Sequence, residues 1–191
     1  EQTQNENAPS STVADDGVIN IYISGSDTRE STLPVRGRSD VNIIASVNLN
    51  TRKVLLLSTP RDYYVPLSIS GGARDKLTHA GIYGVQVSMD TLEMLYDTDI
   101  DYYFRINFTG FEKIVDALGG IEVYSDTAFD SRGAHFEQGI NHLNGEEALI
   151  YCRERYAYAD GDRHRGQNQM DVIKAIAEKA VSPSILKNYF S

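Results

Sequence analysis

Runs of apolar residues divide the chain into five predicted strands. They lie at 18–24, 41–48, 53–58, 102–108 and 121–124, and they are rich in β-branched and aromatic residues. Asn50 and Thr51 make a turn between the second and third runs, which predicts a hairpin. These two runs are almost continuously apolar, a pattern typical of strands that are buried on both faces. Residues 125–143 are polar and are expected to form a loop.

Apolar residues at helical spacing predict four helices. The first carries the stripe Val85, Met89, Leu92 and Tyr96. The second begins at Thr109, in a capping box with Glu112, and ends at Gly119. Asn144 opens a short helix, and Met170, Ile173, Ala177 and Ala180 stripe the last one. This order of elements predicts an α/β fold, a three-layer α-β-α sandwich with a central mixed β-sheet.

The chain has 191 residues, which suits one domain at 17–191 with a sizeable core. Residues 1–16 are polar and aperiodic, and we expect a flexible linker that follows a removed transmembrane tether. The net charge of −9 argues against nucleic-acid binding, which needs a broad basic surface. Cys152 is the single cysteine, so an internal disulfide is excluded; it is either a small buried residue or a nucleophile.

Four arginines lie within thirteen residues of this acidic chain, at positions 153, 155, 163 and 165. The cations of the run are all arginines, whose planar fork binds phosphate oxygens in pairs. Arg165 and Gln169 are four residues apart and share one face of a helix, which Asp162 or a neighbour can cap. The segment is either a solvated charged face or a site for a phosphate or pyrophosphate.

Two carboxylates lie at strand ends near a second group of arginines. Asp27 follows the first predicted strand and Asp40 precedes the second, so an antiparallel pairing brings them together. Arg36 and Arg38 lie in the loop between them. Two carboxylates beside a phosphate can hold Mg²⁺, although both are also ordinary turn residues. Further candidate cations are Arg61, which is equally suited to a surface ion pair, and Lys76.

Several ordered motifs over about residues 18–180 resemble the signatures of the LytR-CpsA-Psr family. They are Gly25-Ser26-Asp27, Gly37-Arg38-Ser39-Asp40, Ser58-Thr59-Pro60-Arg61-Asp62, the 75–80 segment DKLTHA, the 114–121 segment IVDALGGI, the 143–149 segment LNGEEAL, Arg153-Glu154-Arg155, and the D-x-x-R-x-x-x-Q spacing of Asp162, Arg165 and Gln169. Three positions depart from the family pattern: Thr78, His164 and Asn168. Asn168 stands where the family often has another arginine, which puts one phosphate contact in doubt.

The resemblance implies a phosphotransferase that moves a glycopolymer from a polyprenyl-pyrophosphate carrier to peptidoglycan. The glycopolymer is a teichoic acid, a capsular polysaccharide or another secondary cell-wall polysaccharide, and polyprenyl phosphate is the product that leaves. The resemblance also implies the extracellular face of a bacterial membrane, with an N-terminal helical tether that this chain does not contain. The family's older name as transcriptional attenuators conflicts with the acidic charge of this chain, from which we expect no nucleic-acid partner.

The resemblance assigns roles to the candidate residues. Pyrophosphate binding falls to Arg36, Arg38, Arg61, Lys76, Arg153, Arg155, Arg165 and Gln169. The catalytic set is Asp27, Arg38, Asp40 and Arg61, with Mg²⁺ or Mn²⁺ on the two aspartates. A lipid tail needs an apolar groove, for which we expect Ile43, Ala45, Leu57, Val85, Met89 and Leu92, unless these residues simply form core. Which aspartate also acts as a base stays open, and so do two other functions: a polyprenyl-pyrophosphate hydrolase and a lipid-carrier binding protein without transfer activity.

Overall fold

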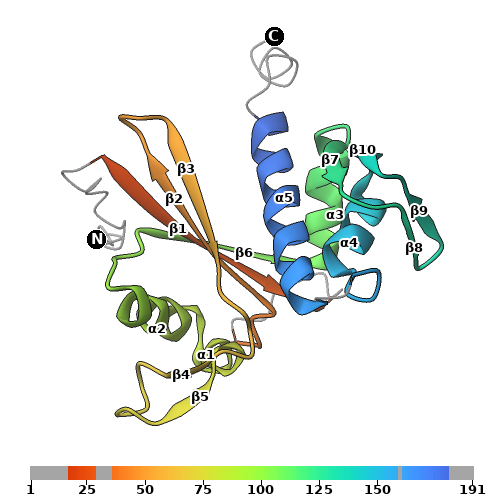
Figure 1. The fold of residues 1–191 in the computed structure, drawn as a ribbon. Helices are drawn as coiled ribbons and strands as arrows, with labels where there is room; N and C mark the ends of the chain where they lie inside the picture. Colours follow the sequence, from red (N-terminus) through yellow and green to blue (C-terminus); the bar gives the residue numbers. More distant parts are fainter. Residues whose placement is uncertain (1–16, 29–35, 159–160, 181–191) are drawn as a thin grey trace, which may run out of the picture.

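The computed structural model describes residues 17–28, 36–158 and 161–180 (Figure 1). The expected linker at 1–16 and the side chain of Asp162 lie outside this description. The central sheet has the strand order β3-β2-β1-β6. Its strands are β1 (Val18–Ser26), β2 (Val41–Asn48), β3 (Lys53–Ser58) and β6 (Tyr102–Asn107). β1 pairs antiparallel with β2 and parallel with β6, so the sheet is mixed, as predicted.

Helices cover both faces of this sheet (Figure 1). On one side lie α1 (Leu77–Tyr83) and α2 (Val85–Tyr96), and on the other lie α3 (Phe108–Ala117), α4 (Gly145–Arg153) and α5 (Asp162–Ala180). The predicted α/β architecture is therefore confirmed. Among the described residues, no helix combines the length and the apolar character needed to cross a membrane.

The buried apolar residues form two separate clusters. One joins the sheet to α2 and includes Tyr22, Ile44 and Leu92. The other joins α3, α4 and α5 to the short strands near the C-terminus and includes Val115, Phe136 and Val172. The second cluster contains no residue of the central sheet. The helices α3–α5 therefore have their own core, and they do not need to fill the space between themselves and the sheet.

The segment expected to be a polar loop, 125–143, instead holds three short strands, β8 (Phe129–Ser131), β9 (Ala134–Phe136) and β10 (Gly139–Leu143). The other additional strands of the molecule are β4 (Tyr64–Pro66), β5 (Arg74–Lys76) and β7 (Ile121–Ser125). β8 and β9 form a hairpin, and β7 pairs with β10. Each of these strands turns only one or two apolar residues inward, such as Phe129 and Phe136, so the alternating pattern is too short to see in the sequence.

The apolar run of β3 also departs from expectation. Val54 and Leu55 are 59% and 66% exposed, although the run predicts burial on both faces. β3 is an edge strand of the central sheet, so fewer neighbours cover it than cover β2. The hairpin of β2 and β3 itself is confirmed, with Ile44 opposite Leu57.

The helices α3 and α4 begin at polar caps. α4 begins with a complete capping box, in which Asn144 Oδ1 accepts a hydrogen bond from Glu147 N at 3.0 Å and Glu147 Oε2 accepts one from Asn144 N at 3.0 Å. The expected cap of the second helix, Thr109, is wrong: Asn107 caps α3, and its Oδ1 accepts from Gly110 N at 2.8 Å. Gly119 and Gly120 follow α3 at φ values of 74° and 85°, where a residue with a Cβ would be strained.

The cap of α4 can be tested by substitution. Asn144→Ala removes one half of the capping box and should lower the free energy of unfolding by about 1 kcal/mol. Asn144→Ser keeps a side-chain acceptor and should lose much less. Urea unfolding followed by circular dichroism measures both, and equal losses in the two variants would contradict the capping role.

Candidate functional site

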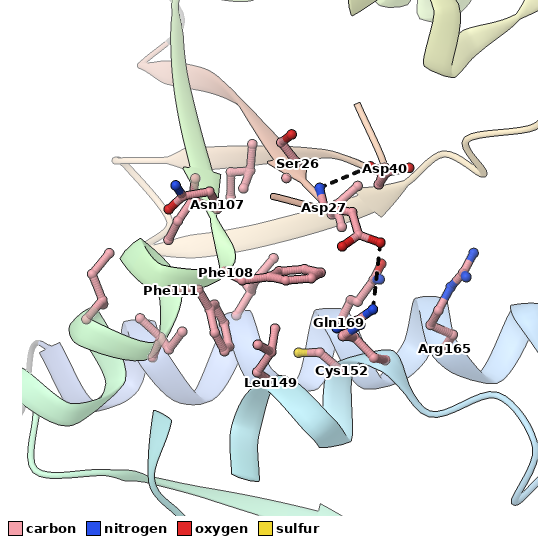
Figure 2. A pocket seen from close by; sticks show the side chains of 18 of the residues that line it. Ser26, Asp27, Asp40, Asn107, Phe108, Phe111, Leu149, Cys152, Arg165 and Gln169 are labelled. Carbon is pink, nitrogen blue, oxygen red and sulfur yellow. Dashed lines mark hydrogen bonds and ion pairs between the residues drawn. The ribbon is translucent and has the colours of Figure 1, made fainter. Parts of the chain in front are cut away.

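A cavity of about 470 Å³ lies between the central sheet and helices α3, α4 and α5. Its polar end is formed where β1 ends, β2 begins and α4 meets α5 (Figure 2). Its apolar end runs along the sheet beneath α3 and the later turns of α5. The polar lining residues include Asp27, Asp40, Arg61, Arg132, Arg153, Arg155, Arg165 and Gln169, and the apolar ones include Ile23, Val41, Phe104, Ile106, Phe108, Phe111, Ile114, Leu149, Ile173, Ile176 and Ala177.

One face of α5 carries both polar and apolar residues of the cavity lining. Arg165, Gln169, Ile173 and Ala177 are each four residues apart and all line the cavity. At 1.5 Å per residue, this face is about 18 Å long. The cavity therefore suits a ligand with a charged head at the start of α5 and an apolar tail that extends toward its end.

The two carboxylates lie next to each other, as their strand positions predict. Asp27 N donates a hydrogen bond to Asp40 Oδ2 at 3.1 Å (Figure 2). The backbone strengthens this link, because Asp40 N donates to the carbonyl of Gly25 at 2.7 Å. Asp40 is the less exposed carboxylate, with 21% of its side chain accessible against 55% for Asp27.

Arg61 connects Asp40 to a chain of charged groups outside the cavity. Its guanidinium donates to Asp40 Oδ1 at 2.7 Å and to Asp62 Oδ2 at 3.3 Å. Lys76 Nζ donates to Asp62 Oδ1 at 2.7 Å, and this ammonium holds the pKa of Asp62 below its usual range. Lys76 is thus linked to Arg61 only through Asp62, and its ammonium pairs with the Asp62 carboxylate.

Three of the expected pyrophosphate ligands do not line the cavity: Arg36, Arg38 and Lys76. The side chains of Arg36 and Arg38 are exposed, in the segment that precedes β2. The backbone of this segment is bound to α1, since Gly37 N donates to Gly81 O at 3.0 Å. Sequence spacing placed these cations near Asp40 but could not show that the loop turns them toward solvent.

Arg153 is the last residue of α4 and reaches the carboxylates across the cavity. Its NH2 lies 3.7 Å from Asp27 Oδ2, and its guanidinium carbon lies 4.3 Å from the centre of the Phe108 ring. A cation over an aromatic face is attracted by the negative charge of the ring. Arg153 and Arg155 flank Glu154, whose backbone is extended, where α4 ends.

Glu154 is a structural residue of the site that the sequence analysis did not select. Its side chain is buried, and Oε1 accepts hydrogen bonds from the backbone amides of Arg155 at 2.8 Å, Tyr156 and Ala157 at 2.9 Å. Burial alone would raise the pKa of Glu154, but the Ser131 hydroxyl and these three amides lower it below its usual range. The sequence pattern that could have pointed to Glu154 is its place between two arginines, Arg153 and Arg155.

Two positions that depart from the family pattern join α5 to its neighbours. Asn168 is buried, and its Nδ2 donates to the carbonyl of Tyr151 at 3.2 Å, so it does not line the cavity. His164 stacks on Tyr158, with ring centroids 3.3 Å apart. Both contacts hold the first turns of α5 against the segment that carries Arg153 and Arg155.

None of the six residues expected to bind lipid lines the cavity. Leu57, Val85, Met89 and Leu92 belong to the core on the opposite face of the sheet. Ile43 and Ala45 share a strand face with the cavity-lining Val41, but they are buried away from the cavity. The helix α2 packs against the sheet, whereas α3 and α5 border the cavity.

Cys152 lines the cavity but is not suited to act as a nucleophile. Burial raises the pKa of its thiol to about 12. Since the thiolate is the reactive form of cysteine, the thiol is inert near neutral pH. The charged side chains that line the cavity are arginines and aspartates.

Comparison with known proteins agrees with the motifs. The LytR_cpsA_psr family model matches residues 1–191. The chain is 37% identical over 172 residues to polyisoprenyl-teichoic acid–peptidoglycan teichoic acid transferase TagU of Enterococcus faecalis, covering 90% of this chain and 56% of that protein. A TagU from Oceanobacillus iheyensis is 39% identical, with 86% of this chain and 52% of that protein covered. The chain thus spans about half the length of these relatives.

Solved structures share the fold. The crystal structure of B. subtilis TagV superimposes with a TM-score of 0.79 at 29% identity, over 92% of this chain and 70% of that chain. B. subtilis TagU gives a TM-score of 0.69 at 34% identity, over 91% and 72% of the two chains. TagT bound to LIIa-WTA gives 0.72 at 34% identity, over 86% and 64%.

The thiol of Cys152 should react slowly in the folded protein. With its pKa raised to about 12, roughly one molecule in ten thousand carries a thiolate at pH 8. A disulfide reagent that absorbs on reaction should modify the native protein far more slowly than the protein in concentrated urea. Rapid stoichiometric reaction of the native protein at pH 8 would contradict the burial of this thiol.

Glu154 should make stability depend on pH. Its folded pKa lies below the ordinary value of 4.5, so its contribution is complete above that pH and is lost as pH falls through the folded pKa. Glu154→Gln should therefore be less stable than wild type at pH 7, and the difference should shrink in acid. Thermal unfolding between pH 7 and pH 3 measures this, with Glu146→Gln, at an exposed residue in the first turn of α4, as the control. A difference that stays constant down to pH 3 would contradict the role of the charge.

Proposed function

Because this chain belongs to the LytR-CpsA-Psr family, we propose that it transfers a glycopolymer from a polyprenyl-pyrophosphate carrier to peptidoglycan. The observation that supports this most directly is the cavity, which has arginines at one end and apolar residues at the other. A polyprenyl pyrophosphate has the same division between a charged head and an apolar tail. Relatives that bear the name teichoic acid transferase support the same substrate class.

The arginines would bind and orient the pyrophosphate. Arg153 and Arg155 approach from the end of α4, Arg165 from the first turns of α5, and Arg61 from the end of β3. Planar guanidinium groups from three elements can hold the two phosphates in one geometry. Gln169, one turn after Arg165, is placed to donate to a phosphate oxygen.

The transfer is a phosphoryl substitution. The oxygen of a peptidoglycan hydroxyl bonds to the phosphorus that carries the glycan, the bond from this phosphorus to the bridging oxygen breaks, and polyprenyl phosphate leaves. Negative charge grows on the bridging oxygen, where the arginines stabilise it. Asp27 is the more exposed carboxylate, and Arg153 is its side-chain contact, so it is the better placed of the two to take the hydroxyl proton.

The carboxylate pair also fits a hard divalent cation. Within the described part of the chain, no group of three or more acidic, histidine or cysteine residues could hold a metal ion. Mg²⁺ does not need such a cage, since it keeps several waters and binds through one or two carboxylates and the substrate phosphates. Asp27 and Asp40 would supply those ligands, and a bound Mg²⁺ or Mn²⁺ would neutralise charge on the phosphate oxygens.

The proposed location is the extracellular face of the cell membrane, where polyprenyl carriers and peptidoglycan meet. The proposed attachment is a helix that precedes the residues of this chain. The apolar end of the cavity supports a lipid-linked substrate, and the relatives' names refer to peptidoglycan.

A transfer assay tests the function. The protein is incubated with peptidoglycan and a polyprenyl pyrophosphate that carries a labelled glycan, with and without Mg²⁺. Label on peptidoglycan supports the proposal. Free glycan phosphate would indicate a hydrolase, and unchanged substrate that stays bound would indicate a lipid-carrier binding protein; either result would overturn transfer.

Arg165→Ala should weaken binding of this lipid pyrophosphate by roughly ten- to a hundredfold, because one charge-assisted bidentate contact contributes about 1.5–3 kcal/mol. Arg165→Lys should recover part of the loss, since it keeps the charge without the fork. Arg163→Ala is the matched control, because Arg163 is exposed on the same helix and does not line the cavity. Calorimetric titration measures affinity. Equal affinities of the Arg165 and Arg163 variants for the lipid pyrophosphate would show that Arg165 does not bind the phosphate.

A further inference from the structure

The cavity contains a fifth arginine, Arg132, which lies on none of the elements that carry the others. It lies in the two-residue turn between β8 and β9, followed by Gly133. Both residues have positive φ, 50° for Arg132 and 88° for Gly133, as a tight hairpin turn of this kind requires. Asparagine, aspartate and glycine suit the first position of such a turn better than arginine does. The backbone therefore does not explain why arginine stands there.

The hairpin is fixed against the other arginines at its base. Phe129 and Phe136 stack at 4.7 Å, and each also contacts Tyr151 of α4, at 5.9 Å and 5.5 Å between ring centroids. Ser131, which precedes Arg132, is buried, and its hydroxyl hydrogen bonds to Glu154. The same carboxylate holds the backbone of residues 155–157. The turn that carries Arg132 is thus linked through Glu154 to the segment that carries Arg155 and Tyr156, and these three residues all line the cavity.

Arg132 differs from the inner arginines in its partners. Arg61 lies 2.7 Å from Asp40, and Arg153 lies 3.7 Å from Asp27. The side chain of Arg132 is exposed and has no ion pair or hydrogen bond with any residue in the described ranges. An arginine that lines the cavity, on a turn that is held in place and without an ion pair among those residues, is available to a ligand.

The partners of the charged groups show which part of the ligand this is. Arg61 and Arg153 pair with Asp40 and Asp27 at the polar end of the cavity. The carboxylate of Glu154 accepts hydrogen bonds from the amides of residues 155–157 and from Ser131. Arg132 lies on a separate hairpin and is available to a group of the ligand that lies beyond these pairs.

We propose that Arg132 binds an anionic group of the glycan itself, next to the pyrophosphate, and makes the site selective for anionic glycopolymers. This inference rests on the proposed function and adds the charge of the transferred polymer to it. The polar end of the cavity, where the glycan leaves, is the end at which Arg132 and the 92% exposed Tyr156 lie.

Two probes test this selectivity. Both are short-chain polyprenyl pyrophosphates that carry an N-acetylated disaccharide, and one of them bears an additional glycerol phosphate on the sugar. Arg132→Asn removes the cation and keeps a residue that tolerates positive φ. It should weaken binding of the anionic probe about tenfold, as expected for one charge-assisted contact, and leave binding of the neutral probe unchanged. Arg132→Lys should restore part of the preference.

Arg52→Asn is the matched control. Arg52 is also an exposed arginine in a hairpin turn with φ 56°, but it does not line the cavity, so its substitution should change neither affinity. Equal losses for both probes in Arg132→Asn would show that Arg132 contacts the pyrophosphate, and no loss for either would show that it contacts no substrate. Both results overturn the proposal.

Binding and transfer are measured with the same probes, so the two proposals can fail separately. If the wild type binds the probes without transferring the glycan, the proposed function fails, while the difference in affinity still tests Arg132. If the wild type binds neither probe, both proposals fail.

Discussion

The convergence of several guanidinium groups at one end of an apolar cavity is the constraint on which the rest of the site depends. Like charges in a partly desolvated space repel one another unless counter-charges lie between them. Asp40 supplies one for Arg61 at 2.7 Å and Asp27 a weaker one for Arg153 at 3.7 Å. The Phe108 ring adds a further contact to Arg153. The carboxylates therefore stabilise the arginines at this end of the cavity.

Glu154 fixes the backbone conformation of the segment that carries Arg153 and Arg155. One buried carboxylate oxygen accepts three consecutive backbone amides, and the other contact of this carboxylate, with Ser131, reaches the neighbouring hairpin. Hydrogen bonds to a charged acceptor are about twice as strong as neutral ones. A single side chain thus orders both loops at the rim, and it does so away from the space that a ligand would occupy, since Glu154 does not line the cavity.

The two separate cores explain how the protein tolerates a large apolar cavity. Unfilled apolar space inside a core normally destabilises a fold. Here the sheet is stabilised by its packing on α2, and the helices α3–α5 are stabilised by their packing on the short C-terminal strands. The cavity lies between these two units, and each of its two sides is supported by its own core. A long apolar groove, lined by the free face of the sheet and one face of α5, is the result.

The sequence by itself determined the strands of the central sheet, the α2 stripe, the capping box at Asn144 and the closeness of Asp27 to Asp40, because these follow from local periodicity, capping and strand ends. It also predicted the helix α5, but not its buried face: the core residues are Val172 and Ala175, and not the expected stripe of Met170, Ile173, Ala177 and Ala180. It also singled out Arg153, Arg155, Arg165 and Gln169, because a run of arginines is unusual in an acidic chain and because Arg165 and Gln169 are spaced to share one face of a helix. Only the tertiary structure decided which helices border the cavity, that Arg36, Arg38 and Lys76 lie outside it, and that Arg132 lies within it. A pattern of apolar residues shows that a face is buried, but whether its partner packs against it or leaves a space depends on residues far away in the sequence.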